Sequence, residues 1–73
     1  MTLADAKKND WVTVASIGGE RSFRRRLLEM GFVHGTRVRV VRVAPLGDPM
    51  ELELRGGRLS IRASEARSIE VTA

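Results

Sequence analysis

The sequence predicts a mainly β protein, a small β-barrel of five short strands with one helix at about residues 20–30. Short runs of β-branched residues alternate with glycine and proline turns along the chain. A chain of 73 residues has room for one domain, spanning residues 1–73, with one modest core. A barrel is expected because closure removes the edges that an open sheet of this size would expose.

The first part of the chain predicts a short helical turn and a strand. Thr2 can cap a turn that begins at Leu3. Residues 11–17 are rich in β-branched side chains and are expected to form a strand, which Gly18 and Gly19 end.

Residues 20–30 are the one segment with a clear helical period. Phe23, Leu27 and Met30 recur at i, i+4 and i+7, so they share one face. Gly31 directly afterwards suits a left-handed C-cap. We therefore expect one amphipathic helix that packs this face on the barrel.

Strands at 37–43 and 50–55 are expected next. The inward phase of the first changes between Val40 and Val41, which indicates a bulge or a barrel corner. Two prolines exclude the loop at 45–49 from any strand interior. In the second strand the residues expected to face inward are Met50, Leu52 and Leu54.

The last part of the chain predicts a hairpin and a closing strand. Gly56 and Gly57 are expected to form its two-residue turn, so residues 58–62 should pair antiparallel with the strand before them. The elements expected after it are a helical turn at 63–66 and a strand with Ile69 and Val71 inward. An SH3-like barrel fits this order, with an OB-like barrel as the alternative.

Composition narrows the setting and the partners. The chain has no cysteine, which excludes disulfides and a thiolate zinc site. It has no secretory signal and no apolar run long enough to cross a bilayer, so we expect a cytoplasmic protein. The net charge of +4, with eleven arginines, favours nucleic acid, anionic lipid or an acidic protein surface as partner.

Two sequence runs resemble the FeoA family of ferrous-iron-transport accessory proteins. The resemblance covers nearly the whole chain and is carried by residues 25–32 (RRLLEMGF) with Gly35, by residues 44–49 (APLGDP), and by Leu59, Ile61, Arg62, Glu65, Ala66, Ile69 and Val71. It implies an SH3-like barrel that assists FeoB, a membrane transporter coupled to a GTPase. Similar domains also end metal-dependent repressors, but the chain begins at its own Met1 without a helix-turn-helix, so we expect the first context.

The sequence departs from the family pattern at two positions. His34 stands where the family often has proline, and Gly57 stands where an aromatic residue is common. Neither position belongs to the barrel pattern, so we expect any effect on surface contacts only.

The sequence contains no set of residues typical of a catalytic site or a metal site. A divalent transition-metal site usually needs several imidazole and carboxylate ligands, and His34 is the only histidine, so we expect no dedicated metal site and no cofactor. No nucleophile has a base that could complete a triad. Glu51 and Glu53 share the outward face of a strand and are expected to be solvated. The Gly18–Gly19 pair lacks the other residues of a phosphate-binding loop. We therefore expect a protein that is not an enzyme.

The helix surface is the predicted partner site. Its arginines are Arg21, Arg24, Arg25 and Arg26, with Glu20 and Arg24 at i,i+4 as a supporting acid–base pair. Leu28 lies among these arginines and is either covered by the barrel or the Thr2–Ala6 segment, or an anchor for a partner. Leu46, in the 45–49 loop, either belongs to the same site or plugs a barrel end. The candidate partner-binding residues are Arg21, Arg24, Arg25, Leu28 and Leu46.

We therefore expect a non-enzymatic accessory protein that docks on the cytoplasmic GTPase region of a FeoB-type transporter and meets the membrane only through it. The alternative is a nucleic-acid-binding barrel that uses the arginine-rich helix. Against it, aromatic rings for base stacking are scarce. A third interpretation is a homo-oligomer.

Overall fold

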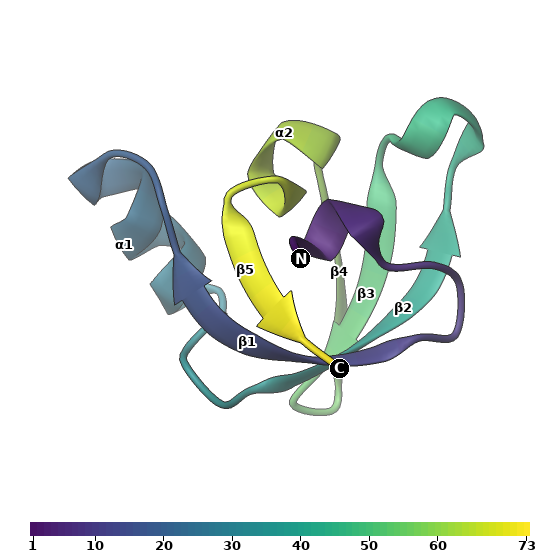
Figure 1. The fold of residues 1–73 in the computed structure, drawn as a ribbon, viewed down its shortest axis with the longest axis horizontal. Helices are drawn as coiled ribbons and strands as arrows, with labels where there is room; N and C mark the ends of the chain where they lie inside the picture. Colours follow the sequence, from purple (N-terminus) through teal and green to yellow (C-terminus); the bar gives the residue numbers. More distant parts are fainter.

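The computed structural model describes all residues, 1–73, and its strands form one antiparallel sheet in the order β4-β3-β2-β1-β5 (Figure 1). The elements in chain order are η1 (Leu3–Asp5), β1 (Trp11–Ile17), α1 (Arg21–Glu29), β2 (Arg37–Val43), η2 (Pro45–Gly47), β3 (Met50–Leu54), β4 (Gly57–Ile61), α2 (Ala63–Ala66) and β5 (Ile69–Thr72). The η1 segment is a single 3₁₀ turn, whereas η2 is a tight turn in which Leu46 has a positive φ of 68°. The predicted five strands and one principal helix are confirmed.

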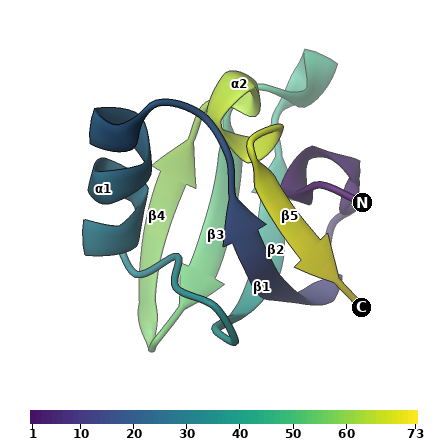
Figure 2. The ribbon, with the colours of Figure 1, turned by 60° about the vertical axis from the view of Figure 1, so that its left-hand side comes forward.

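The sheet curls because two of its strands change direction at bulges (Figure 2). In β2 the register against β3 shifts between Val40 and Arg42, which confirms the bulge that the valine pattern predicts. In β1 the register against β5 shifts between Val14 and Ser16. Each bulge strengthens the local twist, so the sheet wraps around its own inner face.

The core is wholly apolar and lies inside this curve. It contains Leu3, Ala6, Val12, Val14, Leu27, Phe32, Val38, Val40, Met50, Leu52, Leu54, Ile61, Ala66, Ile69 and Val71. No polar or charged side chain is buried. The inward residues predicted for β3 and β5 are all in the core. From the helix Leu27 is fully buried, while Phe23 and Met30 pack against the core from its margin.

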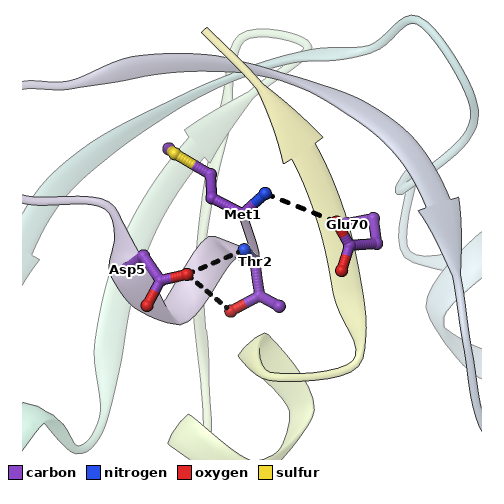
Figure 3. A network of polar contacts seen from close by, with 4 residues as sticks. All are labelled: Met1, Thr2, Asp5 and Glu70. Atoms are coloured by element: carbon purple, nitrogen blue, oxygen red, sulfur yellow. Dashed lines mark hydrogen bonds and ion pairs between the residues drawn. The ribbon is translucent and has the colours of Figure 1, made fainter.

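The N-terminus covers the outer edge of β5 (Figure 3). The Val71 amide donates a hydrogen bond to the carbonyl oxygen of Met1 at 2.9 Å, and the Met1 amino group lies 3.5 Å from the Glu70 carboxylate. Thr2 is the N-cap residue of η1, as predicted, and its amide donates a hydrogen bond to the Asp5 carboxylate at 2.9 Å. This end of the sheet is therefore closed by the chain itself.

The hairpin turn predicted at Gly56–Gly57 lies one residue earlier. Arg55 and Gly56 hold the two positive φ angles, 53° and 77°, and Leu54 pairs with Gly57. The predicted turn would have set Arg55 opposite Arg58, whereas the observed register sets Glu53 opposite Arg58. Opposite charges facing each other across a sheet are favourable and like charges are not, which explains the shift.

Candidate functional site

A groove of about 450 Å³ separates α1 from β1. Its lining consists of Val14, Ala15, Ser16 and Ile17 on the strand side, Arg21, Arg24, Arg25 and Leu28 on the helix side, and Phe32 and His34 from the segment after the helix. The groove exists because Gly18 and Gly19 reverse the chain between β1 and α1. Gly19 has φ +97°, and the ring of Phe23 lies 3.0 Å from the position that a Cβ would take there. Gly19 is therefore the residue that this tight turn requires.

Leu28 is exposed to solvent among the arginines that line the groove. Its side chain keeps 48% of its accessible surface. The Thr2–Ala6 segment does not cover it, because η1 packs on β5 and α2 instead. Of the two interpretations open from the sequence, the covered one is therefore wrong, and Leu28 offers apolar surface next to Arg24 and Arg25.

The four helix arginines differ in their partners. Arg26 pairs with Glu65, and this ion pair links α1 to α2. The Arg26 guanidinium also lies 5.9 Å from the centroid of the Phe23 ring. Arg25 lies 3.7 Å from Glu29, which is an exposed i,i+4 pair. Arg21 and Arg24 have no acidic partner within 4.0 Å.

The predicted Glu20–Arg24 ion pair does not form. Glu20 is the N-cap residue of α1, in an extended conformation, and its carbonyl accepts a hydrogen bond from the Arg24 amide. Because residue 20 has an extended and not a helical backbone, the i,i+4 spacing of a helix no longer sets the two charges side by side. No acidic side chain lines the groove, so its rim is positively charged.

His34 completes this rim, which the sequence analysis did not predict. It is exposed, as expected for a turn residue, and it lines the groove together with the helix arginines. No group of three or more His, Cys, Asp or Glu side chains that could hold a metal ion occurs in the structure. Only the fold brings residue 34 to the same groove as residues 21–25, because the pattern of residues along the chain does not place the two segments together.

Leu46 does not join the other four candidate residues. It is fully exposed with φ +68°, so it does not plug a barrel end. The η2 segment that carries it lies on the other side of the molecule from α1 in both ribbon views (Figures 1 and 2). The structure therefore brings Arg21, Arg24, Arg25 and Leu28 together and leaves Leu46 apart.

The remaining polar and aromatic features are part of the barrel surface. A Glu53 oxygen accepts two hydrogen bonds from Arg39, at 2.8 and 3.0 Å, so this carboxylate is neutralised on the sheet. Trp11 is the only exposed aromatic ring, and the Arg37 guanidinium lies 5.4 Å above it. No helix of the structure is long and apolar enough to span a membrane.

Comparison with known proteins places this chain in one family. The model of the FeoA domain matches residues 1–73. The Fe(2+) transport protein A/Fe(2+) transporter FeoB fusion protein of Porphyromonas gingivalis is 39% identical over 71 residues, which are 97% of this chain and 8% of the fusion protein. The chain thus corresponds to a small part of that relative.

Two solved structures agree with this relationship. The FeoA protein from Chlorobium tepidum is 42% identical, with a TM-score of 0.89 over 99% of this chain and 69% of that one. The zinc complex of FeoA from Stenotrophomonas maltophilia, described as an SH3 domain protein, is 33% identical, with a TM-score of 0.84 over 97% of this chain and 88% of that one. The expected SH3-like barrel and the expected family are both confirmed, and the chain belongs to the FeoA family, which is linked to ferrous iron transport.

Proposed function

We propose that this chain is a non-enzymatic accessory protein of ferrous iron uptake that docks, through the α1–β1 groove, on the cytoplasmic GTPase region of a FeoB-type transporter. The observation that carries the proposal is the Porphyromonas gingivalis relative, in which a FeoA protein and FeoB are one polypeptide. Fusion holds two domains at a high effective concentration, which favours a contact between them. Where the two are separate polypeptides, a surface must make this contact by affinity.

The groove has the composition of such a surface. Leu28 supplies exposed apolar area at its centre, and Arg21, Arg24 and Arg25 surround it. Arginines around a desolvated apolar residue are typical of the few residues that dominate the energy of protein interfaces. The charge favours an acidic surface on the partner and speeds association with it.

The same groove does not support catalysis. Its lining contains one imidazole, that of His34, and no carboxylate, and His34 makes no side-chain hydrogen bond. A catalytic base is normally held by an orienting partner and lies beside a nucleophile. Binding is therefore the function that these residues serve best.

Two variants test the proposal against the purified GTPase region. Leu28→Asp should abolish saturable binding, because the new carboxylate would replace an apolar contact and repel the acidic residues of the partner surface. Leu46→Asp is the matched control, since it changes another exposed leucine on the far side of the molecule, and it should bind normally. Circular dichroism should show both variants folded.

Three outcomes contradict the proposal or part of it. Loss of binding in Leu46→Asp alone would move the interface to the η2 loop. Unfolding of both Leu28→Asp and the milder Leu28→Gln would make Leu28 a structural residue. No binding of the wild type, with retention on single-stranded nucleic acid or self-association instead, would overturn the transporter as partner.

A further inference from the structure

One stretch of β1 has a strand neighbour on one side only. β1 pairs with β2 from Trp11 to Thr13, and the chain before β2 still exchanges hydrogen bonds with Val14, at 2.9 Å to Thr36 and 2.8 Å from Gly35. Beyond Val14, β1 pairs only with β5, at Ser16 and Ile17. The side of residues 15–17 that faces away from β5 forms a wall of the α1–β1 groove.

The backbone of Ile17 points to that open side. The Gly18 amide donates to the Ser68 carbonyl at 2.8 Å, towards the β5 side of the sheet. Amide and carbonyl groups of successive strand residues point to opposite sides. The amide and carbonyl of Ile17 are therefore directed away from β5, to the groove, where no strand of the chain pairs with them.

The side chains around this open edge indicate which kind of segment could bind there. Leu28 provides exposed apolar surface, while Arg21, Arg24 and His34 provide donors and positive charge without any acidic residue. An added strand presents alternate side chains to one face and its backbone to the neighbouring strand. The groove thus offers a backbone partner, an apolar contact and a cationic contact in one place.

We propose that the groove binds an extended, acidic segment of the partner protein, which adds to β1 as a short strand and hydrogen-bonds to the Ile17 backbone. This deepens the proposed function and rests on it, since the segment belongs to the docking partner. The Ile17 amide and carbonyl favour an extended chain over a helix, because a helix has already used its own backbone groups. The carboxylates lie against Arg21 and Arg24, the two helix arginines without an acidic partner.

Amide hydrogen exchange of Ile17 is the direct readout. In the free protein this amide should exchange faster than the paired amides of β1, because it has no strand partner. Saturation with the purified GTPase region of a FeoB-type transporter should slow it at least about tenfold, which is the effect of one new backbone hydrogen bond. The Arg58 amide in β4, away from the groove, serves as the unaffected reference.

Synthetic peptides test the groove without the transporter. The probe is a ten-residue peptide of alternating Glu and Val, blocked at both ends, and it should bind and slow Ile17 exchange. A Glu–Pro peptide has the same charge but no amide at every second residue, so it should bind at least about tenfold more weakly. A Lys–Val peptide should not bind, because it meets the arginines with like charge.

The outcomes separate this inference from the proposed function. Binding of the GTPase region that depends on Leu28 but leaves Ile17 exchange unchanged overturns the added strand and keeps the docking partner. Equal binding of the Glu–Val and Glu–Pro peptides also overturns it, since pairing is then not required. Failure of the GTPase region to bind, with Ile17 protected by the Glu–Val peptide, keeps the strand site and overturns the transporter as its partner. If neither the GTPase region nor the Glu–Val peptide binds, both the strand site and the transporter as partner are overturned.

Discussion

Reversing one charge in the groove should weaken partner binding without harming the fold. The change is Arg24→Glu. Arg24 is exposed, has no acidic partner, and lies one helical turn from both Arg21 and Leu28. Glutamate is as good a helix former as arginine, and it relieves like-charge repulsion with Arg21 at i−3. The free energy of unfolding should therefore stay the same or rise slightly.

The expected loss of affinity follows from the exposure of the site. An exposed ion pair contributes about 0.2–1 kcal/mol, and the reversal removes one attraction and adds one repulsion. The total is about 0.4–2 kcal/mol, which is roughly a 2- to 30-fold increase in Kd. The difference should shrink between 0.1 M and 1 M salt, because the screening length falls from about 10 Å to about 3 Å.

Isothermal titration calorimetry with the GTPase region at both salt concentrations measures this effect. Lys8→Glu is the matched control, because each variant replaces one positive charge by one negative charge and takes the net charge from +4 to +2. Lys8 lies in the segment between η1 and β1, on the other side of the molecule from α1 in both ribbon views. An equal loss of affinity in both variants would show that net charge, and not the groove, controls binding.

Three further predictions concern stability and are measured by thermal unfolding. Arg55→Asn should stabilise the protein by about 0.5–1 kcal/mol, because Asn-Gly suits a turn with two positive φ angles. Gly19→Ala should cost about 1–3 kcal/mol through its φ of +97° and its contact with Phe23, whereas Gly18→Ala should be near neutral. Glu65→Ala should cost about 1–2 kcal/mol, since Glu65 accepts from the Arg62 amide at 2.9 Å and pairs with Arg26.

Each prediction has an outcome that would contradict it. Each kcal/mol corresponds to roughly 4–8 °C in Tm for a domain of this size. A lower Tm for Arg55→Asn would contradict the turn at Arg55–Gly56 and favour one at Gly56–Gly57. Equal effects of alanine at positions 18 and 19 would contradict the strained turn before α1. An unchanged Tm for Glu65→Ala would show that the α1–α2 contact is dispensable.

The order of the elements follows from local patterns in the sequence. Alternating apolar residues predict β3 and β5, the valine phase change predicts the β2 bulge, and the Phe23–Leu27–Met30 stripe predicts the inner face of α1. These patterns are informative because each strand or helix must bury one face in a shared apolar core. The hairpin turn was misplaced by one residue because either position keeps Leu59 and Ile61 inward, and only the cross-strand charges distinguish them.

By itself the sequence determined the barrel, the helix, the arginine-rich helix face and the unusual position of Leu28. Only the tertiary structure decided that Leu28 stays exposed, that Arg26 is used to hold α2, that His34 joins the groove, and that Leu46 lies elsewhere. It also decided that Ile17 presents its backbone to an open edge. The physical reason is that a repeating pattern reports which face of an element is buried, whereas a surface site depends on how separate elements meet in space.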